Sequence, residues 1–323
     1  MSSLLVKSKS SPGEHGFRPE ERPFPLFLRY SVAILDKPSG PSSHVVTKRI
    51  KDALNMGLRV GHCGTLDPKV TGVLPIVIGE ATKATPLITT MDKEYVGTMY
   101  LHGDVTDEEL AEVLKMFETV IYQRPPVRSA VSRTLRTRKI YKIEVLSRRG
   151  RYVELRTVVE SGTYIRKLYH DIGEVLGVGA SMIKLRRVRV GHITEDMCVD
   201  LETLLRAVEL YRNMGDEHYL REKLIPVEEA VKHVKRIVVK DSAVSAIAHG
   251  APVLAPGVSL LSEGISKGDL VGIFTLKGEL VAIARALMSS EEILRAEKGV
   301  VAELLRVVME RDLYPRMWRR RPS

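Results

Sequence analysis

The stretch that decides the fold is residues 61–72, Gly-His-Cys-Gly-Thr-Leu-Asp-Pro-Lys-Val-Thr-Gly, which carries one carboxylate, Asp67. Its glycines permit positive φ or close backbone approach, while Pro68 fixes φ and biases the residues before it toward extended or turn geometry. The apolar run 73–78, Val-Leu-Pro-Ile-Val-Ile, follows directly. The pattern therefore predicts a rigid loop that presents one acid and leads into a buried strand.

Asp67 has two interpretations at this point. Asp-Pro is a common turn pair, and residue types alone favour a structural turn. Rigid loops on a strand are also where catalytic groups tend to lie. A nucleophilic carboxylate needs a cation that keeps it ionised, and a pyrimidine substrate needs a stacking aromatic ring.

Two segments offer such partners. Lys93-Glu94-Tyr95 opens a predicted strand, and residues 161–166, Ser-Gly-Thr-Tyr-Ile-Arg, join a strand to a helix. Tyr164 and Arg166 are two residues apart, so on an extended segment their side chains would point to the same side. Taken singly, Tyr95 could equally be a half-buried strand residue and Arg166 a helix-surface ion pair.

The bulk properties bound the class of protein. A length of 323 residues suits one large or two unequal domains. No apolar stretch approaches the ~18 residues that span a bilayer, and the polar N-terminus lacks the apolar core of a secretory signal. Cys63 and Cys198 have neither disulfide-framework nor zinc spacing. We therefore expect a cytoplasmic protein.

The net charge of +10 is distributed unevenly along the chain. Between residues 124 and 156 the only acids are Glu144 and Glu154. The basic residues in that span are Arg124, Arg128, Arg133, Arg136, Arg138, Lys139, Lys142, Arg148, Arg149, Arg151 and Arg156. Further basic clusters occupy 184–189 and 316–321. Such clusters favour a phosphate backbone as partner, and the scarcity of local acids argues against ion pairing alone.

Periodicity predicts a mixed α+β domain with an extensive sheet. Residues 31–35 suit a buried strand, and Ser42 or Ser43 caps a helix whose apolar face is Val45, Val46, Ile50 and Leu54. The further expected elements are strand 94–101, a helix from the capping box Thr106/Glu109 to Phe117, paired strands 138–146 and 151–159, helix 164–176, strand 182–193 and helix 201–210.

A second, smaller module follows residue 226. Its expected elements are strand 237–239, a helix from Asp241 to Gly250, and strands 258–261, 270–276 and 280–286 with a hairpin turn at Lys277-Gly278. This pattern predicts a compact β domain. Residues 1–27, rich in Ser, Pro and charge, are expected to be irregular or to wrap around the fold.

Several motifs in order carry a family resemblance. They are 35–43 (Leu-Asp-Lys-Pro-Ser-Gly-Pro-Ser-Ser), 61–68, 72–75, 79–83 (Gly-Glu-Ala-Thr-Lys), 93–95, 124–126 (Arg-Pro-Pro), 161–166 and 184–187 (Lys-Leu-Arg-Arg). Together they resemble the TruB family of pseudouridine synthases, and more closely its dyskerin-like branch. Residues 247–253 and 268–271 resemble a PUA domain, an RNA-binding β-barrel.

The resemblance implies a role for each matched residue. Asp67 matches the catalytic aspartate, and Tyr95 the tyrosine that packs on the target base. Tyr164 and Arg166 match the pair that contacts aspartate and substrate, with Arg166 as counter-ion. The remaining matches are Leu185 in the base pocket, His62 ordering RNA near the flipped nucleotide, Lys37 and Pro38 as structural supports, and 124–141 as an RNA-gripping loop that includes Arg124, Arg128, Arg133, Arg136 and Arg138.

The implied reaction is the isomerisation of uridine to pseudouridine in RNA, without cofactor or metal. The target is either the TΨC-loop uridine of tRNA or an rRNA uridine selected by an H/ACA guide RNA. A non-catalytic RNA-binding scaffold is the alternative. The implied partners are RNA, a small zinc-ribbon-type protein, a small β-barrel protein and a kink-turn-binding protein, with no membrane.

The expected fold is a catalytic domain with a large, mainly antiparallel mixed sheet and flanking helices, plus a small PUA β-barrel. The expected division is an N-terminal extension at 1–29 that packs on the PUA domain, the catalytic domain at 30–228, the PUA domain at 234–310 and a basic tail at 311–323.

Overall fold

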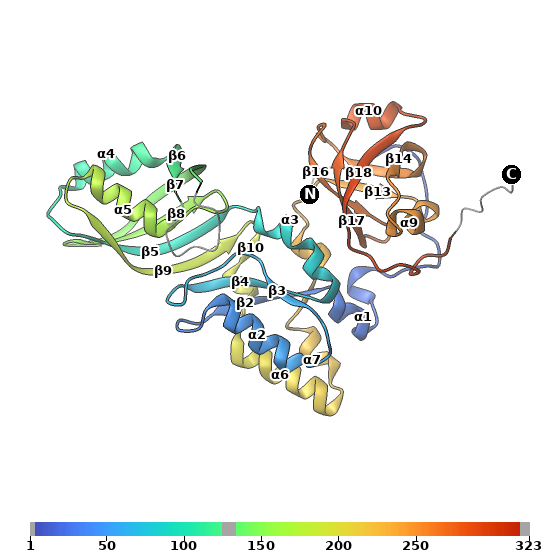
Figure 1. Cartoon of the computed structure of the whole chain (residues 1–323), viewed down its shortest axis with the longest axis horizontal. Helices are drawn as coiled ribbons and strands as arrows, with labels where there is room; N and C mark the ends of the chain where they lie inside the picture. The colour runs from blue at the N-terminus through green and yellow to red at the C-terminus, as the bar shows by residue number, and fades with distance from the viewer. Residues whose placement is uncertain (1–3, 125–133, 317–323) are drawn as a thin grey trace.

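The computed structural model of the chain describes residues 4–124 and 134–316. Arg128 and Arg133 of the predicted RNA-gripping loop, and most of the predicted basic tail, lie outside the described residues. Two sheets dominate the described part: a long sheet that runs through two lobes and a separate smaller sheet beside them (Figure 1). The α+β fold class is confirmed.

The long sheet has 11 described strands and is mainly antiparallel. Its main path runs β11-β2-β4-β9-β5-β8-β7-β6, with β3 on β4, β10 on β9 and β12 on β2. The strands are β2 (Ser31–Lys37), β3 (Val60–His62), β4 (Thr71–Ile78), β5 (Lys93–Leu101), β6 (Val120–Gln123), β7 (Arg136–Arg149), β8 (Tyr152–Val159), β9 (Ala180–Val190), β10 (Ile193–Thr194), β11 (Val199–Asp200) and β12 (Ile225–Pro226). The short parallel pairing of β4 with β9 joins the two lobes.

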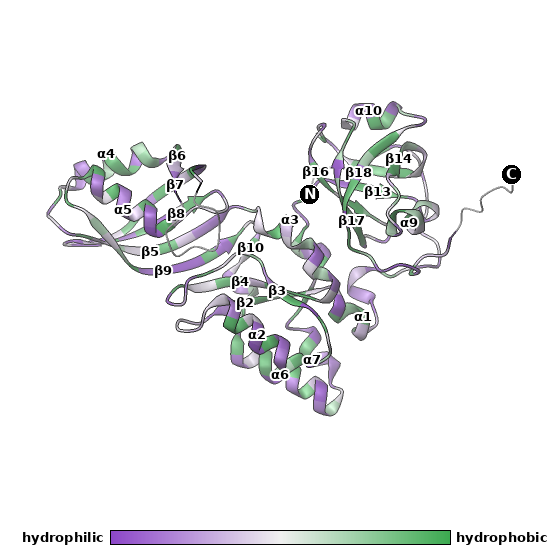
Figure 2. Ribbon diagram, in the orientation of Figure 1, coloured by the Kyte–Doolittle hydropathy of each residue, from purple (hydrophilic) through white to green (hydrophobic). Residues whose placement is uncertain are grey.

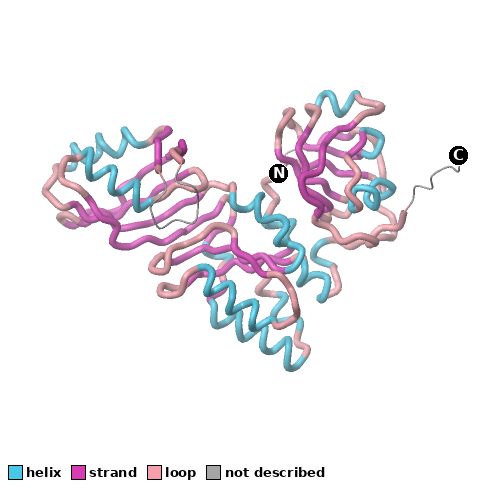
Figure 3. Tube along the Cα trace, in the orientation of Figure 1, coloured by secondary structure: helices cyan, strands magenta, loops and turns pink. Residues whose placement is uncertain are grey.

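Helices lie against each lobe of the long sheet (Figures 1 and 3). α2 (Ser43–Leu54), α6 (Leu201–Met214) and α7 (Glu217–Arg221) accompany β2 and β4, whereas α4 (Asp107–Phe117) and α5 (Ile165–Val175) accompany β5, β7 and β8. α3 (Thr85–Thr89) lies between the lobes. None of the helices within the described ranges has both the length and the apolar character that a membrane span requires.

The helix starts follow the sequence closely. Ser42 caps α2 by accepting a hydrogen bond from Val45 N–H at 3.2 Å, and Thr106 with Glu109 forms the predicted capping box of α4. One residue of the predicted apolar face was wrong, since Val45 is 46% exposed. The residues that α2 buries include Val46, Thr47, Ile50 and Leu54.

The smaller sheet has seven described strands in the order β1-β15-β13-β16-β17-β18-β14. They are β1 (Leu4–Val6), β13 (Arg236–Val239), β14 (Val253–Leu254), β15 (Val258–Ser262), β16 (Leu270–Phe274), β17 (Leu280–Ala286) and β18 (Val300–Val307), with α9 (Asp241–Ala248) and α10 (Ser290–Arg295) beside them. Figure 2 shows apolar residues concentrated along β16 and β17.

The N-terminal segment is more regular than expected. β1 pairs with β15 of the smaller sheet, and α1 (Phe24–Arg29) buries Phe24, Phe27 and Leu28. Residues 1–27 were expected to be irregular or to wrap around the fold: residues 7–18 form no helix or strand, while β1 and α1 are regular elements that the sequence did not predict.

Buried charges join the N-terminal segment to both sheets. Arg22 makes two hydrogen bonds to Glu228 of α8 (Val227–Ala230), at 3.0 and 2.7 Å, and lies 4.0 Å from Glu279. The Tyr314 hydroxyl donates to Glu279 at 2.7 Å, and burial raises the pKa of Glu279. An apolar core also crosses this junction, with Val32 and Val77 on one side and Phe274 on the other.

Candidate active site

Asp67 lies in the connection between β3 and β4, exposed but flanked by buried Leu66 and Val70. The Val70 N–H donates to the Asp67 carbonyl at 3.0 Å, which closes the predicted Asp-Pro turn. The neighbouring Pro68 carbonyl accepts from the Gly40 N–H at 2.9 Å. The turn thus presents a carboxylate to solvent from an anchored backbone.

Two side chains from the preceding strand and helix support this turn. The Ser43 hydroxyl donates to the Leu66 carbonyl at 3.0 Å and accepts from the Leu66 N–H at 2.8 Å. The buried Lys37 ammonium donates to the carbonyls of Pro38, Pro68 and Val70 at 2.8, 3.1 and 2.9 Å. Burial lowers the pKa of Lys37, while the nearby negative charge of the turn opposes that effect.

Two buried cations lie behind the same loop. Arg187, on β9, donates to the carbonyls of Val73 at 2.7 Å and Gly64 at 3.0 Å. Lys93, at the start of β5, donates to the carbonyl of Thr89, the last residue of α3, and to the carbonyl of Met91 just beyond it, each at 2.5 Å. Burial and the neighbouring Arg187 lower the pKa of Lys93 to about 8. Gly72 has φ +104°, and a Cβ there would lie 2.1 Å from the Arg187 carbonyl oxygen.

Arg166 is the counter-ion of the exposed carboxylate. Its Nη2 lies 2.5 Å from Asp67 Oδ2, and the two side chains are 61% and 53% exposed. The segment 164–166 is not extended: in agreement with the predicted helix 164–176, Tyr164 is the N-cap of α5 and Arg166 lies in its first turn. The arginine reaches the acid from a helix surface rather than from a strand.

Tyr164 is half-buried, and both of its backbone groups are held by one distant side chain. The Tyr164 N–H donates to Gln123 Oε1 at 2.9 Å, and Gln123 Nε2 donates to the Tyr164 carbonyl at 3.2 Å.

Tyr95 and Leu185 lie on adjacent antiparallel strands, β5 and β9, and both side chains are nearly buried. Gly97, two residues from Tyr95 on the same face, pairs with Leu185. A Cβ at Gly97 would lie 2.7 Å from Leu185 Cδ1, so the glycine leaves room for that leucine. Both predicted pocket residues belong to the core that also contains Leu66 and Ile165, the neighbours of Asp67 and Arg166.

His62 ends β3, half-buried, on the approach to the Asp67 turn. Burial lowers the pKa of His62 most, and the charges of Arg187 and His44 lower it further. The lowered pKa favours a neutral ring at neutral pH. Its Nδ1 is buried and has no hydrogen-bond partner among the residues that the structure describes.

The basic region between residues 124 and 156 splits into two groups. Some of its arginines form ion pairs with acids from elsewhere in the chain, although the scarcity of local acids had argued against ion pairing. These pairs are Arg148–Asp107, Arg151–Asp104 and Arg156–Glu94. Arg124 is exposed, Arg136 and Arg138 are half-exposed on β7, and within the described ranges none of the three forms an ion pair.

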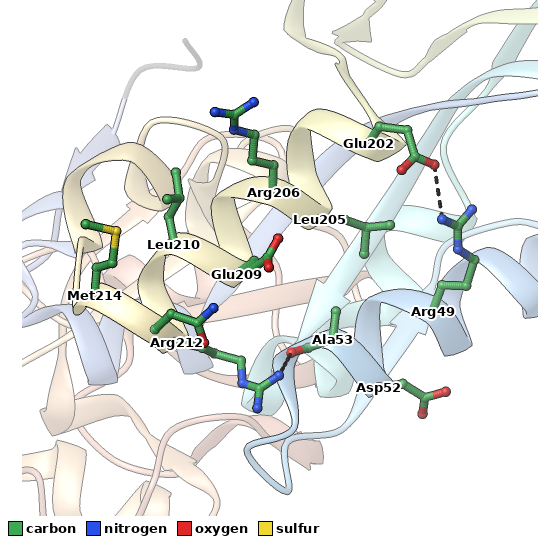
Figure 4. Close-up of a pocket in the computed structure, with 11 residues that line it drawn as sticks. Arg49, Asp52, Ala53, Glu202, Leu205, Arg206, Glu209, Leu210, Arg212 and Met214 are labelled. Carbon is green, nitrogen blue, oxygen red and sulfur yellow. Dashed lines mark hydrogen bonds and ion pairs between the residues drawn. The ribbon is translucent and has the colours of Figure 1, made fainter.

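A groove between α2 and α6 contains none of the predicted site residues. Two of its charged side chains are tied within the groove: Arg49 lies 3.0 Å from Glu202, and Arg212 donates to the Ala53 carbonyl at 3.0 Å (Figure 4). The candidate site is instead the exposed surface around Asp67, where the predicted site residues gather.

Sequence reasoning missed four supporting residues: Ser43 as a turn anchor, Lys93, Arg187 and Gln123. Ser43, Lys93 and Arg187 lie within the motifs 35–43, 93–95 and 184–187. Their place in these motifs is the sequence signal that could have identified them. Gln123 directly precedes the motif 124–126, and its backbone partner is 41 residues away.

Comparisons with known families cover almost the whole chain. Residues 51–165 match the family described as TruB family pseudouridylate synthase (N terminal domain), and residues 166–232 match the tRNA pseudouridylate synthase B C-terminal domain. Residues 235–308 match the PUA domain, and residues 1–47 match the DKCLD (NUC011) domain.

Individual proteins agree with these matches. A relative from Korarchaeum cryptofilum (strain OPF8), named probable tRNA pseudouridine synthase B, is 56% identical over 98% of this chain and 97% of its own length. A chain of a Cbf5-Nop10-Gar1 complex is 46% identical, covers 98% of this chain and 96% of itself, and has a TM-score of 0.91.

A chain of an H/ACA RNP bound to a substrate RNA containing 2′-deoxyuridine is 44% identical, with a TM-score of 0.91 and 98% coverage of both chains. Family membership decides against the non-catalytic scaffold. The chain belongs to the TruB family of pseudouridine synthases, RNA isomerases, and carries a PUA domain.

Proposed function

We propose that Asp67 is the catalytic aspartate of this isomerase and that Arg166 is its counter-ion. The observation that carries the proposal is the 2.5 Å contact between the two side chains, made on an exposed turn. The turn backbone is fixed by Ser43 and Lys37, so the carboxylate is held in place before substrate arrives. Lys37 and Pro38 serve as structural supports.

The target uridine must leave its stack to reach Asp67, at a cost of a few kcal/mol that pocket and phosphate contacts offset. Tyr95 packs on the extruded base, Leu185 lines its pocket, and Tyr164 contacts the substrate beside the acid. His62, with its depressed pKa, orders the neighbouring RNA as a neutral ring.

Two routes are consistent with one ionised carboxylate. Asp67 either forms a covalent bond with the substrate or assists cleavage of the glycosidic bond through an eliminated sugar intermediate. In both, the uracil rotates and rejoins the sugar through carbon, and Tyr95 assists the final proton removal.

The proposed substrates are a TΨC-loop uridine of tRNA and rRNA uridines selected by an H/ACA guide RNA. The name of the Korarchaeum relative supports the first, and the two H/ACA complexes support the second. Arg124, Arg136 and Arg138, unpaired within the described ranges, are available to contact phosphates, and Arg128 and Arg133 would extend that surface. Such substrates place the proposed activity in the cytoplasm.

We propose four functional segments: an N-terminal extension (1–29) that packs on the PUA domain, the catalytic domain (30–228), the PUA domain (234–310) and a basic tail (311–323). The pairing of β1 with β15 supports the first assignment. The expected protein partners are the small zinc-ribbon-type, small β-barrel and kink-turn-binding proteins of the H/ACA particle, supported by the Cbf5-Nop10-Gar1 likeness.

Tritium release from 5-labelled uridine tests the substrate assignment. The full chain is incubated with a tRNA transcript, then with a guide RNA and its matched target, each with and without the partner proteins. Release from tRNA by the chain alone supports the unguided activity, and release that requires guide and partners supports the guided one. The absence of release from both RNAs under all conditions would contradict the proposal.

A further inference from the structure

Gln123 is the last residue of β6, is 2% exposed and is the only glutamine in the 323-residue sequence. Its side-chain amide forms two hydrogen bonds with the backbone of Tyr164, accepting from the N–H at 2.9 Å and donating to the carbonyl at 3.2 Å. A buried amide that both donates to and accepts from the backbone of one residue is a fixed contact, since breaking either bond leaves a buried polar group unpaired.

This contact lies at the start of α5. The first N–H groups of a helix lack intrahelical partners, and the N-cap Tyr164 makes no side-chain capping hydrogen bond. Gln123 therefore holds the N-cap residue from outside the helix. The Tyr164 carbonyl also accepts the first hydrogen bond of the helix, from the Leu168 N–H at 2.9 Å. One oxygen therefore bonds both the Gln123 amide and the first turn of α5.

The position of the Tyr164 peptide also bears on the contact with Asp67. Arg166 stands two residues beyond Tyr164, in the first turn of α5, and extends to Asp67. On its other side, Gln123 pairs with Arg136 of the antiparallel neighbour β7 and precedes Arg124. One buried amide thus connects β6, which lies beside the arginines of β7, to the helix turn that carries the counter-ion.

We propose that Gln123 is a positioning residue: its amide holds the Tyr164 peptide so that Arg166 meets Asp67 in the reactive arrangement. This inference rests on the proposed function of Asp67. The amide is chemically required, because an ionised glutamate of the same shape could accept from the Tyr164 N–H but would place a negative oxygen against the Tyr164 carbonyl.

The test is the pH dependence of Gln123→Glu in the full chain. Turnover is measured at saturating RNA, using whichever of the two RNAs named above the wild-type chain converts, and each rate is divided by the wild-type rate at the same pH. At pH 8 we expect turnover roughly 100-fold below wild type, as for a misplaced catalytic group, with unchanged RNA affinity.

At lower pH the activity ratio is expected to rise toward one. Burial raises the pKa of an introduced carboxyl group, and the neutral acid then donates to the Tyr164 carbonyl while still accepting from the Tyr164 N–H. Protonation would therefore restore both bonds of the native amide. A role in folding alone would give a loss that does not recover with pH.

The control is Tyr122→Glu, which adds the same charge one residue earlier on β6, at a side chain that is 69% exposed. Its kcat is expected to stay near wild type. Thermal melting of both variants reports folding. A Gln123→Glu ratio near one at every pH, or a loss that is constant with pH, would overturn the positioning role. Failure of the proposed function itself would appear separately, as turnover by Asp67→Asn.

Discussion

Asp67 shows how a common turn pair can hold a proposed catalytic group. The carboxylate is solvent-exposed, yet Leu66 and Val70 on either side of the turn are buried, and the turn backbone accepts bonds from Lys37. Its contact with Arg166 joins two exposed side chains, so it is worth little to stability and can open for substrate. Residue types alone favoured a structural turn, because Arg166 lies 99 residues away in the sequence and does not show in the local pattern.

Lys93 gives a prediction at the same scale. Its pKa is about 8 in the folded chain, below its ordinary 10.5, so between these pH values the unfolded chain binds more protons. Stability therefore rises with pH across that window, by up to roughly 3 kcal/mol. Denaturant unfolding of wild type and Lys93→Met over pH 7 to 11 measures this contribution. The difference between the two free energies of unfolding isolates Lys93, because the other titrating groups contribute equally to both proteins. A stability difference that stays flat with pH would exclude it.

At the scale of elements, hydrophobic alternation and capping residues predicted β5, β8 and α4 well, because these signals are local. Helix 164–176 was predicted to within one residue of α5 at each end, but the contact that holds its N-cap was not, since that contact comes from a side chain on β6. β18 (Val300–Val307) was also missed, because Glu303 and Arg306 interrupt its apolar residues and no clean strand alternation remains. Its antiparallel pairing with β17 makes the segment a strand.

The close approach of β4 to β9 supplies a prediction for an element boundary. Gly72→Ala would place a methyl group 2.1 Å from the Arg187 carbonyl oxygen at φ +104°, so strand pairing must shift. We expect destabilisation of about 3 kcal/mol or more. Gly150→Ala is the matched control, with positive φ but open space, and should cost about 1 kcal/mol. Equal effects of the two variants on unfolding would refute the steric argument.

Across the whole molecule, the site draws on the β3–β4 turn, α2, α5, β5 and β9, and a shared core joins the catalytic lobes to the PUA domain. Motif order predicted the family, which the comparisons confirm, and it named site residues, which stay predictions. It did not predict the junction, where a charge from the N-terminal segment is buried between acids of two domains.

That junction yields a stability prediction. Arg22→Met leaves Glu228 and Glu279 buried without their cation and should destabilise the chain by about 3–5 kcal/mol. Arg49→Met, which breaks the exposed pair with Glu202, should cost less than about 1 kcal/mol. Denaturant titration of both variants compares them. A small effect of Arg22→Met would show that the buried charges do not hold the domains together.

The most direct test of the central claim is single-turnover product formation by Asp67→Asn. The variant keeps the size of the side chain and a hydrogen-bond acceptor for Arg166, while it removes the carboxylate charge. We predict RNA binding close to that of wild type and no pseudouridine at any enzyme excess. Pseudouridine formed at a measurable rate by Asp67→Asn would contradict the assignment of Asp67 as the catalytic residue.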